Sequence, residues 1–229
     1  MLKQAGVITA ALFLLTSIGL AQDGHYDASV SAAAVFTKES DGNGIAQSAT
    51  AGSNYFGTFR VKFRPKHSLA FNYGRAKDSQ VYQTGFDFHV LTTITEYTGA
   101  YIYNPVKKGR FEPFVLVGGG ALSFNPTSAW DFLGYYTVTT VTGQKISLPN
   151  RILVNLGAVK QTEIAFLYGG GVDYRLPRFN RFSLRLQYRG LLYNAPDFKV
   201  TTASNSAVSL FTGARGHMAE PSIGLVFRF

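Results

Sequence analysis

Charged side chains that alternate with bulky apolar ones are the residues of this sequence whose types and spacing could do chemistry. Arg60 and Lys62 fall opposite a row of aromatic side chains in residues 54–64, and residues 181–192 place Arg185 and Arg189 in the same way. Charges on an enclosed face must pair, because an unpaired buried ion is strongly destabilising. We therefore predict one interior ion-pair network formed by Arg60, Lys62, Glu96, Asp173, Arg185, Arg189, Glu220 and Arg228, with Glu96 and Glu220 each paired to an arginine.

The segments that carry these charges have the two-residue period of β-strands, and helical periodicity is nearly absent. Weaker alternation marks six more strands at residues 28–36, 69–73, 97–103, 111–124, 164–174 and 217–229, of which 111–124 is apolar on both faces. Rows of apolar side chains that alternate with polar ones are typical of a closed sheet between lipid and a polar interior.

The composition agrees with membrane strands. Aromatic residues make up 14% of the 229 residues and charged residues only 15%, while Gly occurs 24 times. After residue 22 no apolar run is long enough for a spanning helix, so membrane residence would require a closed barrel, since lipid tolerates no open sheet edge. The absence of cysteine excludes disulfides and thiolate metal sites.

The predicted connections alternate in length. Short links at 64–68, 104–110 and 176–180 each contain a proline, and long links lie at 38–53, 75–91, 125–162 and 194–216. This predicts an all-β, membrane-spanning, antiparallel up-and-down β-barrel of about eight strands, with short periplasmic turns and long extracellular loops. Extended strands around 81–90 are an alternative to a loop there, and the aromatic residues of 125–162 could contact a partner or extend the barrel wall.

Residues 1–21 have the pattern of a secretory signal peptide. Lys3 precedes an apolar stretch, and Gly19 and Ala21 supply small residues before a cleavage point. An uncleaved anchor helix is the alternative, but residues 7–21 are short for a span. We expect a leader at 1–21 that is cleaved and a single barrel domain at 22–229.

The last eight residues carry a resemblance to a known family. Ser222, Gly224, Leu225, Phe227 and Phe229 match the C-terminal signal of bacterial outer-membrane barrels, which the barrel-assembly machinery reads. Together with segments 96–101, 113–120 and 167–174, the chain resembles the small OmpA/OmpX/OmpW-type outer-membrane β-barrel superfamily in its barrel-only form. The resemblance implies a monomer in the outer membrane of a Gram-negative-type bacterium, in contact with outer-membrane lipids and lipopolysaccharide.

Three other patterns suggest chemistry less strongly. The glycine triplets at 118–120 and 169–171 lack the lysine and the helix of a phosphate loop. Residues 39–50 lack the terminal glutamate of a calcium loop, and Asn43-Gly44 favours a turn. His89 and His217 lie near Asp87, Ser222 and Glu220 in sequence, which leaves a lipid A-modifying acyl enzyme open as an alternative.

Net charge and the distribution of aromatic residues narrow the classes of function that the sequence allows. The formal net charge of +9 gathers in residues beside the short links, and no nucleic-acid-binding module is visible. Aromatic residues predicted to form interfacial girdles are Tyr55, Tyr101, Tyr103, Phe111, Phe124, Tyr193 and Phe227. We expect no cofactor, metal site or catalytic residues, and a structural or surface-interaction role. Two alternatives are a narrow channel for small hydrophobic solutes, through the same interior charges, and the acyl enzyme.

Overall fold

The computed structural model describes residues 25–83, 87–106, 109–139, 144–156, 160–179, 181–201, 207–209 and 212–229. The predicted signal peptide at 1–21 lies outside these residues. Within the described ranges, no helix is long and apolar enough to cross a membrane.

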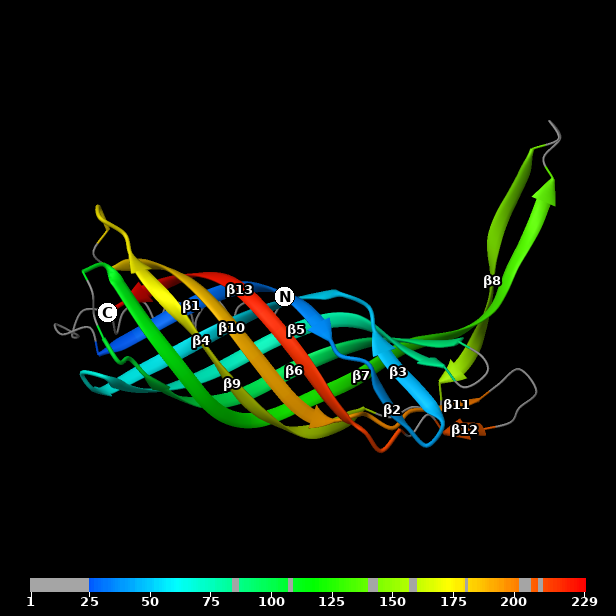
Figure 1. The fold of residues 1–229 in the computed structure, drawn as a ribbon, viewed down its shortest axis with the longest axis horizontal. Helices are drawn as coiled ribbons and strands as arrows, with labels where there is room; N and C mark the ends of the chain where they lie inside the picture. The colour runs from blue at the N-terminus through cyan, green and yellow to red at the C-terminus, as the bar shows by residue number, and fades with distance from the viewer. Residues whose placement is uncertain are drawn as a thin grey trace, which may run out of the picture.

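Eight antiparallel strands close into a barrel (Figure 1). Each strand pairs with its neighbours around the barrel, and the first pairs with the last, so that no sheet edge remains along the wall. This confirms the predicted all-β, up-and-down barrel. The eight strands are β1 (Tyr26–Thr37), β4 (Gly52–Arg64), β5 (His67–Gln83), β6 (Asp87–Tyr103), β7 (Phe111–Thr139), β9 (Gln161–Arg175), β10 (Phe182–Asn194) and β13 (Arg215–Arg228).

One end of the barrel holds the short turns and both ends of the described barrel chain; we call it the turn end. Tyr26 and Phe229 exchange backbone hydrogen bonds of 3.2 and 3.0 Å there. The connections β4–β5, β6–β7 and β9–β10 lie at the same end and fall in the three predicted short links. Proline explains their position, because it lacks the N–H that a continuing ladder would need.

The opposite end, the hairpin end, is more regular than predicted. Strands β5 and β6 pair as far as Gln83 and Asp87, and β7 continues to Thr139 to pair with β8 (Lys145–Leu156), which projects beyond the barrel in Figure 1. Residues 75–91 and 125–162, predicted as long links, are therefore strand over most of their length, which confirms the alternative of extended strands around 81–90. Beyond the apolar row of β5 the outer face carries Arg75, Lys77 and Ser79 and the buried inner face carries Asp78 and Gln80, so hydrophobic alternation no longer marks the strand.

Smaller strands complete the hairpin end: β2 (Ser40–Gly42), β3 (Ile45–Ala49), β11 (Lys199–Thr201) and β12 (Ala207–Ser209). The predicted turn at Asn43-Gly44 is confirmed as the two-residue connection between β2 and β3. Its φ angles are 50° and 73°, as a type I′ hairpin turn requires.

Alternate side chains face the exterior and the interior, as predicted. Val30 and Tyr55 are 70% and 65% exposed, whereas their neighbours Ser31 and Asn54 are buried. The prediction of interfacial girdle positions was wrong for Phe124 and Tyr193, which are 0% and 4% exposed and face the interior. Residues 111–124 are apolar on both faces, so the phase of that strand could not be deduced from hydrophobicity.

Candidate functional site

The first group of interior charges, the Arg189 cluster, lies across the middle of the barrel. Arg189 of β10 binds Glu96 of β6 through two hydrogen bonds of 3.0 and 2.8 Å, and it also pairs with Glu220 of β13. Asn54 donates a hydrogen bond of 2.7 Å to the other oxygen of Glu220. The guanidinium lies 3.7 Å from the centre of the Phe56 ring, a short cation–π contact. One arginine thus pairs with two carboxylates, one on the neighbouring strand β13 and one on the distant strand β6.

Glu96 is also the end of a polar ladder on the inner face of β4, β5 and β6. Thr58 donates to Asn72 at 2.8 Å, Asn72 donates to Thr98 at 2.9 Å, and Thr98 donates to Glu96 at 2.6 Å. Gly74 provides the space beside it, because a Cβ at that position would come within 3.1 Å of a Glu96 oxygen. The carboxylate is therefore fixed by hydrogen bonds in addition to its charge partner.

The second group, the Asp173 cluster, lies closer to the turn end. Arg185 holds Asp173 with two hydrogen bonds of 2.7 and 3.0 Å, the bidentate geometry that a guanidinium favours. Arg60 lies 3.5 Å from Asp173 and 3.7 Å from Asp27, and Arg185 lies 3.5 Å from Asp27. Both guanidiniums also sit over the Phe114 ring, at 5.0 and 5.4 Å from its centre. The cluster fills this level with two cations and two anions.

The third group, the Glu112 cluster, closes the turn end. Glu112 accepts hydrogen bonds from Arg228 at 3.1 Å and from Arg175 at 2.5 Å, and a further ion pair with Arg228 spans 2.9 Å. Arg228 also lies 3.7 Å from Asp173, which joins this group to the Asp173 cluster.

Together the three clusters balance their charges. They contain five arginines and five carboxylates, namely Arg60, Arg175, Arg185, Arg189, Arg228, Asp27, Glu96, Glu112, Asp173 and Glu220. The structure thus brings seven of the eight sequence-predicted network residues into ion pairs. Lys62 is half-buried, and none of the ion pairs named above involves it.

Sequence reasoning missed three of the ten paired residues, Asp27, Glu112 and Arg175. Asp27 stands at an inward position of the first strand, directly before the outward Ala28 and Val30, so the alternation could have identified it. Glu112 lies in the strand that is apolar on both faces, where the only signal is that a carboxylate rarely faces lipid.

Above the Arg189 cluster, towards the hairpin end, the interior becomes apolar. Phe124 and Tyr193 pack with ring centres 5.4 Å apart, and Tyr82 meets Phe198 edge-to-face at 6.3 Å. Phe198 belongs to residues 195–198, which we call the cap segment and which follow β10. Gln161 binds the cap by accepting from the backbone N–H of Asp197 at 2.7 Å and donating to its carbonyl.

A polar group flanks the cap. Gln47 donates to Gln80 at 2.9 Å and to Tyr82 at 3.2 Å, and Gln80 donates to Asp78 at 2.7 Å. Asp78 lies beyond Tyr73, the last exposed large apolar residue that we find on β5. Burial raises the pKa of Asp78 to about 7, against the opposing effect of the hydrogen bond from Gln80.

The histidine that suggested acyl chemistry is separated from its sequence neighbours by the barrel wall. His217 lies on the outer face and contacts the Tyr168 hydroxyl at 2.9 Å, whereas Glu220 faces inward to Arg189. Ser222 donates to the carbonyl of Gln187 at 3.2 Å. These three residues therefore do not form a catalytic group.

The C-terminal residues predicted to form an assembly signal lie in and directly after β13. Leu225 is exposed on the outer face, and Gly224 faces inward beside Ser31. Phe229 stacks with Tyr26 at 6.1 Å and with Phe227 at 5.8 Å, forming an aromatic group at the turn end.

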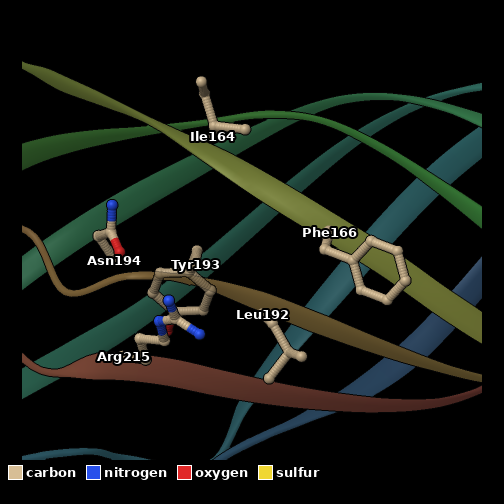
Figure 2. A pocket seen from close by; sticks show the side chains of 6 residues that line it. All are labelled: Ile164, Phe166, Leu192, Tyr193, Asn194 and Arg215. Atoms are coloured by element: carbon tan, nitrogen blue, oxygen red, sulfur yellow. The ribbon is translucent and has the colours of Figure 1, made fainter.

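The outer wall carries an open groove near the hairpin end, of about 430 Å³, shown in Figure 2. Its lining combines apolar side chains with one cation and one amide: Ile164, Phe166, Leu192, Tyr193, Asn194 and Arg215. Arg215 pairs in register with Asn194, so the polar part of the groove is at its hairpin-end side.

Comparisons with known proteins identify the fold. No protein-family model and no curated protein sequence matches the chain. Among solved structures, the outer membrane protein OprG from Pseudomonas aeruginosa aligns with 89% of this chain and 95% of its own, at 14% identity and a TM-score of 0.53. A major outer membrane protein from Thermus thermophilus aligns with 89% of this chain and 99% of its own, at 14% identity and a TM-score of 0.52. The chain has the closed eight-stranded fold of the small outer-membrane β-barrels.

Proposed function

We propose that this chain is a monomeric outer-membrane β-barrel protein with a structural or surface-interaction role and a closed interior. The observation that carries the proposal is the filling of the barrel by five arginines and five carboxylates from seven of its eight strands. An eight-stranded barrel is only just wide enough for its interior side chains, so paired charges at three levels leave little room for a continuous water path.

The exterior supports the membrane location. Rows of exposed apolar side chains surround the barrel, and aromatic residues gather at the turn end, where a ring can bridge lipid tails and headgroups. Short turns on one side and longer hairpins on the other are the arrangement of outer-membrane barrels, with the turns in the periplasm. We propose that a signal peptide at 1–21 directs export and that the C-terminal strand is read by the barrel-assembly machinery.

The hairpin end offers an interaction surface. The sheet path ends at β2 on one side and at β12 on the other; β2 lies against Thr212 and Arg215, whereas β12 has a free edge among the described residues. A free strand edge presents backbone N–H and C=O groups that a partner strand can pair with. A protein partner at the cell surface that adds a strand to the edge of β12 is the kind of contact this end favours.

A second candidate function is a narrow conduit for small hydrophobic solutes. It is favoured by the apolar section near the hairpin end, where Leu122, Phe124, Tyr193 and Phe198 face one another inside the barrel. A solute that entered there would meet the Arg189 cluster and could cross only if those ion pairs separated. The position of His217, outside the wall from Glu220, gives no support to the lipid A-modifying alternative.

Conductance and uptake measurements separate the two functions. The full chain, refolded into planar bilayers, is expected to give no steady ion conductance, and cells that produce it are expected to take up small hydrophobic solutes at the rate of a vector control. A steady channel in most insertions, or faster uptake, would contradict the closed interior. Arg64→Gln, at the exposed turn end, is the control for altered charge without altered filling.

A further inference from the structure

A pair of cations faces outward at the hairpin end of β5. The outer row of this strand runs through exposed Leu69, Phe71 and Tyr73 and continues with Arg75 and Lys77, which are also exposed. Residues two apart on a strand point to the same side and are about 7 Å apart. The apolar row of β5 therefore ends in two adjacent positive charges.

These cations line an open hollow on the outer wall. Arg75 pairs in register with Tyr55 of β4 on one side and Thr95 of β6 on the other, and Lys77 pairs with Ser53. Ser53, Tyr55, Arg75 and Lys77 line an open hollow of about 430 Å³. The hollow thus combines two positive charges, two hydroxyl groups and the face of an aromatic ring.

No acidic partner satisfies the two cations within the described part of the chain. The ion pairs of the barrel are formed by inward-facing carboxylates, and Asp78, which follows Lys77 directly, faces inward and accepts from Gln80. Five of the seven other arginines on the eight wall strands have carboxylate partners inside. Arg75 and Lys77 are left available for an anion from outside.

Their position defines the kind of anion. Below them, Tyr73 and Tyr97 form an exposed ring pair with centres 5.3 Å apart, which continues the apolar surface. A ligand that suits this surface has a phosphate next to hydrocarbon chains: the phosphate meets the guanidinium and ammonium, and the chains lie over the tyrosines. A guanidinium binds phosphate oxygens in pairs, and the lysine adds a point charge.

We infer that Arg75 and Lys77, with Ser53 and Tyr55, form a binding site for the phosphorylated headgroup of a lipid A-type glycolipid in the outer leaflet. The inference rests on the proposed membrane location and its orientation, and it names a lipid partner and the residues that hold it. The groove of Figure 2 lies on another part of the wall and has Arg215 as its single cation, so it is expected to hold such a phosphate more weakly.

The test compares lipid binding by three forms of the full chain refolded in dodecyl maltoside. Native mass spectrometry measures binding of diphosphorylated lipid A, of the same lipid with both phosphates removed, and of inorganic phosphate. The wild type is expected to bind the phosphorylated lipid at least tenfold more tightly than the dephosphorylated one. Arg75→Gln/Lys77→Gln is expected to lose that preference, and it is designed to leave the interior unchanged.

Arg64→Gln/Lys66→Gln is the matched control, because it removes the same two charges at the same spacing from the turn end. It is expected to bind as the wild type does. Equal binding by the Arg75/Lys77 variant and the wild type would overturn the site, as would equal affinity for dephosphorylated lipid. Tight binding of inorganic phosphate alone would show an anion site that is not selective for lipid, and would overturn the assignment to a glycolipid.

Insertion distinguishes a failure of this site from a failure of the proposed function. A folded barrel migrates differently on unboiled and boiled gels, and this readout does not depend on lipid A. If the wild type inserts into phospholipid bilayers but binds without regard to phosphate, only the site is refuted. If it does not insert, both the proposed membrane function and the lipid-binding site are refuted.

Discussion

Removing Arg189 should destabilise the barrel more than any change at its surface. The side chain is fully buried, makes two hydrogen bonds to Glu96 and one to Glu220, and lies over Phe56. Arg189→Met keeps much of the length and the contact with the ring but leaves two buried carboxylates without their counterion. Breaking a buried pair from one side typically costs about 3–5 kcal/mol, because the remaining charge has no compensation.

A compensated variant isolates the electrostatic part of that cost. Arg189→Met/Glu96→Gln/Glu220→Gln removes all three charges and leaves amides that can bond with each other, with Thr98 and with Asn54. Since neutral replacements of a buried ion group are often close to neutral in stability, the triple variant should recover at least about 2 kcal/mol of the loss.

The assay is equilibrium unfolding in urea from phospholipid vesicles, followed by the unboiled gel band and by circular dichroism. Lys66→Met, an exposed turn residue, is the control and should change the free energy of unfolding by less than about 0.5 kcal/mol. The reasoning is refuted if Arg189→Met costs less than about 1 kcal/mol, or if the triple variant is no more stable than the single one.

Three further predictions concern the ends of the barrel. Burial raises the pKa of Asp78 to about 7, above its ordinary value of 3.8, so the folded state favours the protonated carboxyl group. The resulting contribution to the free energy of unfolding is present below pH 4 and is lost as the pH rises through 7. Hydrogen exchange of residues 78–83 should therefore speed up between pH 5 and 8 beyond the intrinsic rate, and Asp78→Asn should abolish that extra change. Phe198→Ala should lower the local stability of residues 195–198 by about 3–5 kcal/mol and expose them to proteolysis. Bilayer conductance should nevertheless stay at baseline. A steady channel would show that the cap, and not the ion pairs, blocks the barrel. Phe229→Ser should lower the amount of barrel assembled in cells several-fold while Phe63→Ser, an exposed aromatic at the same end, does not; equal yields would argue against a terminal signal.

Much of the wall could be predicted from the sequence because the two sides of the wall impose opposite chemistry. Arg60, Arg185 and Arg189 alternate with exposed apolar neighbours, and that contrast gave both the strands and their inward faces. The contrast disappears in 111–124, where the interior is apolar as well, so Glu112 was missed and Phe124 was assigned to the exterior.

The hairpin end was less predictable for two physical reasons. Where β5 and β6 extend past the exposed apolar row, polar residues such as Lys77, Asp78 and Gln80 stand on both faces, so hydrophobicity no longer alternates although the inner face stays buried. The cap depends on contacts between residues far apart in the sequence, such as the binding of Gln161 to the backbone of Asp197 and the packing of Tyr82 against Phe198. No local sequence pattern predicts such a contact, because a glutamine in a strand is ordinarily solvated.

Cysteine labelling tests the central claim most directly, and the chain suits it because it contains no cysteine of its own. Spin labels at Val30→Cys and Leu225→Cys, in the exposed rows, are predicted to collide with oxygen dissolved in lipid and to be shielded from a water-soluble nickel reagent. Labels at the buried Ser31 and Ser183, substituted in the same way, are predicted to be shielded from both. High accessibility of the Val30 and Leu225 labels to the nickel reagent would contradict a barrel whose apolar rows face hydrocarbon.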